Sequence, residues 1–322
     1  MKTENDLTQS IESKLKALNA EILHKVGYPR HGKKLLDYIA RKDREVAFVK
    51  SIQNVNTLGT IFKELKRLSC FLNVNALVIA DKFNDEPMLD GVLHIRDRVG
   101  VVKIDTLNGI TKGDKVYVYE YKGMYYVKID GEKLRGLRIR KGYGLRELAR
   151  TVGASIKALQ MYEEGLIDMS IEKAYRFMEL FAEEFEEVLK EVDIFRDRII
   201  DPHTHRRSTV PKEDEDKQKL LEAMSCQGAE AEAFNHLPSD IIVNKDGIRI
   251  FMTIIDNNID AESAITKAKE NRAFSRLLDG IATNIVKDSV PSELVKEIEN
   301  YGTTLKYETI TRGGLKLERE LF

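Results

Sequence analysis

Apolar residues recur at helical spacing in the middle of the chain, and glycines interrupt the pattern. Leu145, Leu148 and Val152 lie on one face of a helix. Gly153 can end this helix because glycine adopts left-handed backbone conformations at little cost, and Ser155 can cap a second helix. The pattern predicts two short helices joined by a tight turn.

Two further helices should cover this pair, because two short helices cannot bury their own apolar stripes. The preceding segment offers Leu134 and Leu137 as inward positions. The following segment, Ser170 to Ala182, starts with a capping serine. Its expected inner stripe comprises Ala174, Phe177, Met178 and Phe181. The sequence therefore predicts an all-α bundle.

A second pattern, typical of a β-hairpin, occurs twice. DYIARKDREVAFVKSI, from Asp37, aligns without a gap with DIIVNKDGIRIFMTII, from Asp240. Each predicts two strands, with turns at Arg44-Glu45 and Asp246-Gly247. A helix and two apolar strands follow each hairpin, at 57–72, 76–80 and 99–104 in the first copy and at 261–278, 283–286 and 301–306 in the second. We expect two copies of one α/β domain.

Two connectors separate these parts. KVYVYEYKGMYYVKI, residues 115–129, predicts a β-hairpin that turns at Lys122-Gly123. We expect its tyrosines to pack on a neighbouring domain; stacking on bases or ligand rings is the alternative. The second connector has mixed charge and should be exposed. Its polar residues allow a transition-metal site or phosphate contacts as alternatives, and they are Asp201, His203, His205, Arg206 and Arg207.

The predicted fold class is a multidomain protein that combines α/β domains with an all-α bundle. With 322 residues and 42% hydrophobic content, the chain can form two or three cores. The expected parts are an α/β domain at 1–112, a β-hairpin connector at 113–130, the bundle at 131–194, a charged linker at 195–219, and a second α/β domain at 220–322.

Charge is balanced overall and uneven locally. The chain has 52 basic and 53 acidic residues, but residues 131–165 hold eight basic against four acidic, and residues 166–193 hold three against nine. A basic face with an acidic back would orient the bundle on a polyanion. The alternative is that the acidic residues only solvate a helix.

The chain has no apolar run of membrane-spanning length and begins with a polar segment, so we expect a cytoplasmic protein that binds no membrane. Cys70 and Cys226 lack metal-binding spacing, and we expect both to be reduced, buried thiols.

The central segment resembles the phage-repressor (Cro/C1) class of helix-turn-helix domains, through LR..R...G.. with LRELA..VGAS and the closing YEEG, over about sixty residues. The resemblance implies that Ser155 to Glu163 is a recognition helix in the DNA major groove. Lys157 and Gln160 would then contact base edges, Ile156 a thymine methyl group, and Ser155 and Arg146 phosphates. Arg138 and Glu163 match positions that pair inside such domains. The alternative for Lys157 and Gln160 is a solvated helix face.

The two α/β copies resemble the restriction-endonuclease and Holliday-junction-resolvase fold, over roughly residues 1–110 and 215–322. Such nucleases hold Mg²⁺ between one acidic residue and the first acid of an Asp/Glu-x-Lys triplet. The triplets here read Phe48-Val49-Lys50 and Phe251-Met252-Thr253. Phenylalanine cannot ligate a hard cation. We therefore expect degenerate domains without catalytic residues, metal or cofactor, which serve in dimerisation.

The whole arrangement resembles a family of archaeal helix-turn-helix transcriptional regulators. It implies a sequence-specific, non-enzymatic regulator that binds double-stranded DNA as a homodimer and contacts the transcription machinery. The alternatives are a Mg²⁺-dependent nuclease or junction-processing enzyme, and an adaptor whose bundle binds protein.

Overall fold

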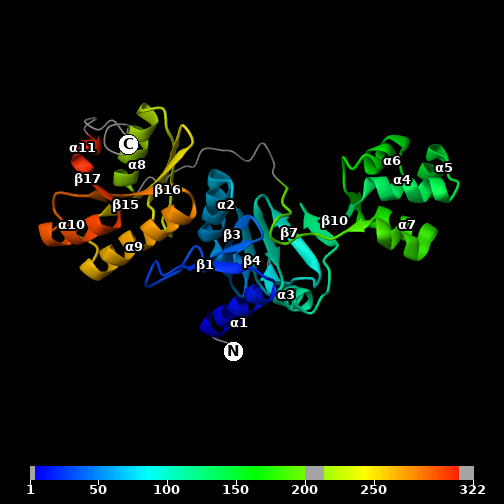
Figure 1. Ribbon diagram of the computed structural model, residues 1–322, viewed down its shortest axis with the longest axis horizontal. Helices are drawn as coiled ribbons and strands as arrows, with labels where there is room; N and C mark the ends of the chain where they lie inside the picture. Colours follow the sequence, from blue (N-terminus) through cyan, green and yellow to red (C-terminus); the bar gives the residue numbers. More distant parts are fainter. Residues whose placement is uncertain (1–3, 84, 200–213, 312–322) are drawn as a thin grey trace. The chain divides into compact units, whose positions relative to one another are not determined.

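The computed structural model describes residues 4–83, 85–199 and 214–311 (Figure 1). It divides into two compact units, a first unit of residues 1–21, 41–59 and 73–202, and a second unit of residues 22–40, 60–72 and 203–322. No described helix has both the length and the apolar character needed to cross a membrane.

The first α/β repeat contains the predicted hairpin, helix and apolar strands. Its elements are α1 (Glu4–Ala17), β1 (Glu21–Lys25), β2 (Tyr38–Lys42), β3 (Glu45–Ser51), the 3-10 helix η1 (Val55–Leu58), α2 (Thr60–Leu72), β4 (Asn75–Ile79), β5 (Lys82–Phe83), β6 (Glu86–Pro87), β7 (Val92–Arg96), β8 (Val99–Val102) and α3 (Ile104–Thr111). The strand order is β1-β2-β3-β4-β8, and β4 runs parallel to both β3 and β8. The hairpin turns one residue earlier than we predicted, since Asp43 has a φ of 55° and β3 already begins at Glu45.

The second repeat has a similar order of elements, with α10 and η3 where the first repeat has β5, β6 and β7. Its elements are α8 (Glu215–Cys226), β13 (Glu230–Ala233), β14 (Ile241–Lys245), β15 (Ile248–Ile255), α9 (Ala261–Leu277), β16 (Gly280–Val286), α10 (Ser292–Ile298), the 3-10 helix η3 (Glu299–Tyr301), β17 (Thr303–Lys306) and α11 (Tyr307–Thr311). The strand order β13-β14-β15-β16-β17 matches that of the first repeat. In both halves a hairpin is followed by a helix and by two further strands that join the sheet in parallel.

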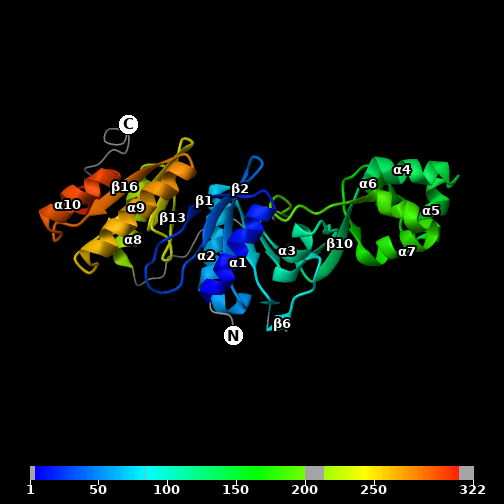
Figure 2. The same ribbon diagram turned by 60° about the horizontal axis from the view of Figure 1, so that its bottom comes forward.

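Helices cover both faces of the second repeat's sheet (Figures 1 and 2). Side chains of α8 and α11 join one core cluster with the sheet, while α9 and α10 form another with the strand ends. The central strand β15 is buried along most of its length, as expected for a strand covered on both faces. Two predictions were wrong here: α8 begins inside the segment predicted to be a linker, and Cys226 is exposed.

A β-hairpin extends the sheet of the first unit. It consists of β9 (Val118–Tyr121) and β10 (Met124–Ile129), and both turn residues, Lys122 and Gly123, have positive φ, at 52° and 81°. β9 pairs with β7, and β10 pairs with two short strands of the helical region, β11 (Met169–Ser170) and β12 (Leu189–Lys190). In addition, the Asp130 N–H donates to the Val188 carbonyl at 2.8 Å. The helical region is therefore not purely α.

This helical region contains α4 (Gly131–Arg140), α5 (Leu145–Thr151), α6 (Ile156–Glu163), α7 (Ile171–Phe181) and the 3-10 helix η2 (Ala182–Val188). Its core includes the predicted inward residues Leu134, Leu137, Leu148, Val152, Ala174, Phe177 and Phe181. Met178 is an exception, because it is 40% exposed rather than part of the inner stripe. We call this region, residues 131–188, the α4–η2 bundle.

Candidate DNA-binding surface and buried charged cluster

The α5 and α6 helices meet at a tight turn that the sequence fixes locally. Gly144 occupies the N-cap of α5, and Gly153 follows that helix with a φ of 62°, in the left-handed region that favours glycine. Ser155 caps α6, since its Oγ accepts a hydrogen bond from the Ala158 N–H at 3.0 Å. These three predicted positions are confirmed.

A buried ion pair fixes α6 from behind. Arg138 of α4 donates from Nε and Nη2 to the two carboxylate oxygens of Glu163, at 2.5 and 2.9 Å. The two side chains are only 13% and 7% exposed. The hydrogen bond with Glu163 raises the pKa of Arg138. This two-point contact orients the end of α6 relative to α4.

The turn between α5 and α6 is also braced by α7. The Lys173 ammonium group donates to the Gly153 carbonyl. Arg176 packs so close to Gly153 that a Cβ atom there would collide with its guanidinium group. The end of α5 and the start of α6 are thus held by side chains from a third helix.

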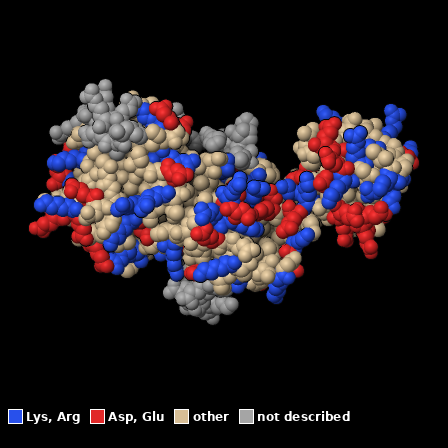
Figure 3. Space-filling view, in the orientation of Figure 1, with Lys and Arg blue, Asp and Glu red and all other residues tan. Residues whose placement is uncertain are grey.

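The outward face of α5 and α6 carries the candidate DNA-contacting residues. Arg146 lies on α5, Ser155 caps α6, and Ile156, Lys157 and Gln160 lie on α6; all five are exposed. Within the described part of the chain, no hydrogen bond or ion pair holds the side chains of Arg146, Lys157 or Gln160. Leu159 and Tyr162 face the core. Acidic side chains gather on another side of the bundle, over α7 (Figure 3).

In the predicted hairpin, Tyr119 is buried and stacks on Tyr126 with a ring separation of 5.4 Å. Its hydroxyl donates to the Asp168 carboxylate at 2.9 Å. Tyr119 therefore serves packing, not stacking on a ligand. The predicted linker residues Asp201, His203, His205, Arg206 and Arg207 lie outside the described residues.

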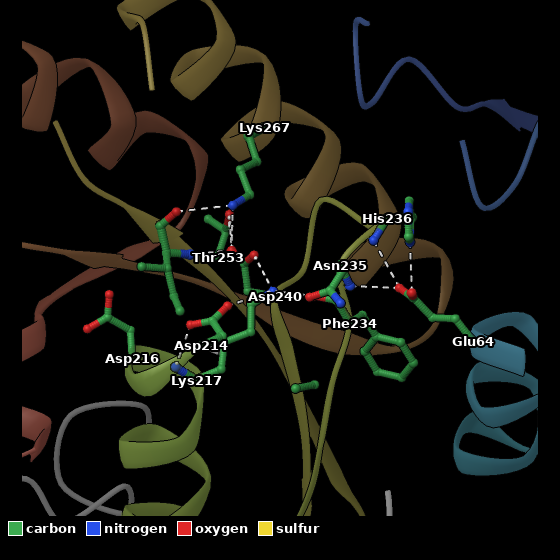
Figure 4. Close-up of polar contacts among 12 residues, drawn as sticks. Glu64, Asp214, Asp216, Lys217, Phe234, Asn235, His236, Asp240, Thr253 and Lys267 are labelled. Atoms are coloured by element: carbon green, nitrogen blue, oxygen red, sulfur yellow. Dashed lines mark hydrogen bonds and ion pairs between the residues drawn. The ribbon is translucent and has the colours of Figure 1, made fainter. Parts of the chain in front are cut away.

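The second repeat contains a buried charged cluster around Asp240, directly before β14 (Figure 4). Asp240 Oδ2 lies 2.5 Å from Lys267 Nζ of α9 and 2.7 Å from the Ile254 amide nitrogen. The Thr253 hydroxyl lies 3.5 Å from the same oxygen. Lys217 Nζ of α8 lies 3.4 Å from Asp240 Oδ1.

Each lysine of this cluster has further oxygen partners. Lys267 donates to the Ile254 carbonyl at 3.1 Å, and Lys217 donates to the Phe234 carbonyl at 2.6 Å. Burial alone would lower the pKa of Lys267, but the Asp240 carboxylate outweighs burial and raises it. Both lysines lie within ion-pair distance of one buried carboxylate. Sequence reasoning missed both, because they lie on helices outside the aligned hairpin.

Two carboxylates of the second unit hold loops in matching ways. Glu64 of α2 accepts from the Asn235 and His236 amides at 2.7 and 2.9 Å and contacts His236 Nδ1 at 2.8 Å. Glu270 of α9 accepts from the Gly27 amide at 3.0 Å and contacts His24 Nε2 at 2.8 Å. Each glutamate thus binds a loop of the other repeat. The gap-free repeat alignment would not have paired these two residues, because it places Glu64 opposite Lys267; a gap of three residues before the helices is needed to pair them.

A divalent metal ion, which the endonuclease resemblance implies, does not fit the second repeat. The carboxylate that the resemblance points to, Asp240 directly before β14, is already bound by two lysines. The triplet positions in the two repeats, Phe48 and Phe251, are fully buried apolar side chains. Among the described residues, no group of three or more His, Cys, Asp or Glu side chains could hold a metal ion. In the first repeat, Asp37 is half-buried and Lys50 is buried.

Comparisons with known proteins agree with parts of this picture. Residues 4–116 match the PD-(D/E)XK superfamily domain, which confirms the endonuclease-like resemblance for the first repeat. No solved structure matches the chain. A protein of Methanocaldococcus jannaschii is 29% identical over 276 residues, 80% of each chain, and one of Thermoplasma acidophilum is 26% identical over 258 residues, 80% of this chain and 79% of the relative. One of Pyrococcus furiosus is 34% identical over 165 residues, 51% of each chain. All three carry the name "Putative HTH-type transcriptional regulatory protein". The chain is thus similar to archaeal proteins named as transcriptional regulators, and it begins with a PD-(D/E)XK-like domain.

Proposed function

We propose that this protein is a transcriptional regulator that binds double-stranded DNA sequence-specifically by placing α6 in the major groove. The observation that carries the proposal is the contrast between the two sides of α6. Its inner side is fixed by the Arg138–Glu163 pair, whereas Lys157 and Gln160 on its outer side are exposed. A rigid helix with unengaged polar side chains is the arrangement that base readout requires.

Each exposed residue has a role that its chemistry suits. Lys157 and Gln160 hydrogen-bond to base edges, and Ile156 contacts a thymine methyl group. Arg146 binds a backbone phosphate. The Ser155 oxygen accepts the capping bond, and its hydroxyl hydrogen donates to a phosphate.

A homodimer would supply two copies of α6 for successive major grooves, which lie about 34 Å apart. Under this proposal the protein is not an enzyme, and it acts on chromosomal DNA in the cytoplasm and contacts the transcription machinery. The names of its archaeal relatives support a regulatory role. Nuclease activity has less support, because neither repeat has a carboxylate at the phenylalanine of its triplet.

Binding to the DNA upstream of the protein's own gene, compared with a shuffled duplex, tests the proposal. The measurement is made at physiological salt with Mg²⁺ present. We expect at least roughly tenfold tighter binding to the native duplex, within the usual range of specific over nonspecific binding, with the DNA intact. Lys157→Ala and Gln160→Ala should each cost about 1 to 3 kcal/mol on that duplex and little on others.

Lys296→Ala is the control, because Lys296 is an exposed lysine on α10. Equal losses on all duplexes from the α6 variants would contradict base readout. Cleavage of the DNA would instead favour the nuclease alternative.

A further inference from the structure

We propose that the Lys267 ammonium group is the resident cation of the second repeat and supplies the positive charge that a divalent metal ion supplies in PD-(D/E)XK nucleases. The residues around Asp240 do not fit the divalent metal ion that the endonuclease resemblance implies. The proposal does not depend on DNA binding by α6.

The partners of Lys267 are oxygens of the kind that hard cations bind. Its Nζ lies 2.5 Å from a carboxylate oxygen of Asp240 and 3.1 Å from the backbone carbonyl oxygen of Ile254 (Figure 4). Carboxylate and backbone carbonyl oxygens are typical ligands of Mg²⁺ and Ca²⁺. Here one ammonium group uses both, and the Ile254 amide occupies the same carboxylate oxygen at 2.7 Å.

Both lysines of the cluster already face carboxylates without a metal. Lys217 lies 3.4 Å from Asp240 Oδ1 and also 3.4 Å from Asp214 Oδ2. The two lysines therefore face two carboxylates. A divalent cation beside Asp240 would meet repulsion from two ammonium groups, in a buried setting where charge interactions are strong.

The first repeat differs at the corresponding positions. With the helix ends aligned at Leu72 of α2 and at Leu278, the C-cap residue of α9, which requires a three-residue gap after the hairpins, the residue of α2 that corresponds to Lys267 is Ile61. On the strand, the residue that corresponds to Thr253 is Lys50. The second repeat thus carries its lysine on α9 rather than on the strand, and this lysine ties α9 to Asp240 and β15.

The ammonium group also reaches outside the second repeat's own sequence. It lies 5.8 Å from the centre of the Tyr28 ring, a cation–π distance. Lys267 is therefore built into the packing of the second unit as well as its charge balance. A metal ion would add nothing that the chain does not already provide there.

Thermal unfolding of the full-length protein, with Mn²⁺ as the probe, tests this assignment. We expect the wild-type Tm to stay unchanged on adding millimolar Mn²⁺ or EDTA. Lys267→Gln removes the charge, leaves Asp240 Oδ2 with the Ile254 amide but without an ionic partner, and should lower the Tm by several degrees. Mn²⁺ should then restore part of that loss, and the added substitution Asp240→Asn should abolish the restoration.

Arg276→Gln is the matched control, because it removes an exposed positive charge from the same helix. Its Tm should be close to that of the wild type and insensitive to Mn²⁺. Saturable Mn²⁺ binding to the wild type that Asp240→Asn removes would overturn the proposal, and this arm remains decisive if Lys267→Gln does not fold. A folded Lys267→Gln variant with no Mn²⁺ response would also overturn it.

Discussion

The α4–η2 bundle and the second repeat each bury an ion pair. The pair in the bundle lies behind a candidate binding surface, whereas the pair in the second repeat lies inside a candidate metal site. Arg138 and Glu163 lie behind α6 and leave its outward face exposed. Lys267 and Asp240 lie at the position where the endonuclease resemblance places a reactive carboxylate, and they occupy it. A buried charge pair beneath a surface can support binding, whereas one inside a site leaves no group for a ligand.

The largest expected effect comes from breaking the pair behind α6. Arg138→Ala leaves Glu163 buried without its partner and should lower the free energy of unfolding by about 3 kcal/mol. DNA affinity should fall as well, because α6 loses its fixed orientation. Urea unfolding and DNA titration of the same preparation measure the two effects.

Arg140→Ala removes an exposed arginine from the same helix and should leave the free energy of unfolding nearly unchanged. The comparison predicts that Lys267→Gln lowers stability while DNA affinity is kept. If Lys267→Gln reduced DNA affinity as strongly as Arg138→Ala, the distinction between the two pairs would be wrong.

Glu120 of β9 is a third buried carboxylate, which can be compared with Glu163 and Asp240. It neither supports α6 nor lies in a repeat's triplet position. Burial raises its pKa, but hydrogen bonds from His94, Arg96 and the Gly123 amide outweigh burial and lower it to about 2. The folded-state pKa lies below the ordinary 4.5, so this stabilisation is present above pH 4.5 and is lost as the pH falls to about 2.

Glu120→Gln should therefore lower the free energy of unfolding by about 2 kcal/mol at pH 6, and the difference from wild type should shrink between pH 4.5 and 2. Urea unfolding at several pH values measures it. DNA affinity at neutral pH should be unchanged. A stability difference that stays constant across this pH range would show that Glu120 contributes through packing alone.

The smallest expected effect concerns the brace at the α5–α6 turn. Lys173→Met removes the hydrogen bond to the Gly153 carbonyl and should cost about 0.5 to 1 kcal/mol of stability, with a few-fold loss of DNA affinity. Lys133→Met is the control, because Lys133 donates to the Glu187 carbonyl in the same bundle but away from the turn. Equal losses of DNA affinity in the two variants would show that the Lys173–Gly153 hydrogen bond has no particular role in DNA binding.

Local signals in the sequence were sufficient for much of the fold. The periodicity of Leu148 and Val152, with Gly153 and Ser155 at the turn, predicts α5 and α6 because helix ends depend on neighbouring residues. Met178 was wrongly assigned to the core, since helical spacing alone does not give the width of the buried stripe.

The buried cluster could not be predicted in the same way. Lys217, Asp240 and Lys267 lie on three elements that only the tertiary fold brings together. Charged residues at such positions look like solvent-facing residues in a sequence. The alignment of Asp37 with Asp240 located the strand beside which the cluster lies. It did not show that Lys217 and Lys267 are the partners of Asp240.

The pairing of β10 with both β11 and β12 has a consequence for engineering. The bundle starts and finishes beside one strand, where the Asp130 amide donates to the Val188 carbonyl. A segment whose two ends lie side by side can be exchanged as a cassette without displacing its surroundings. Under the proposed function, a different DNA-binding bundle with the same end spacing, grafted between residues 130 and 188, would direct the rest of the chain to a new target sequence.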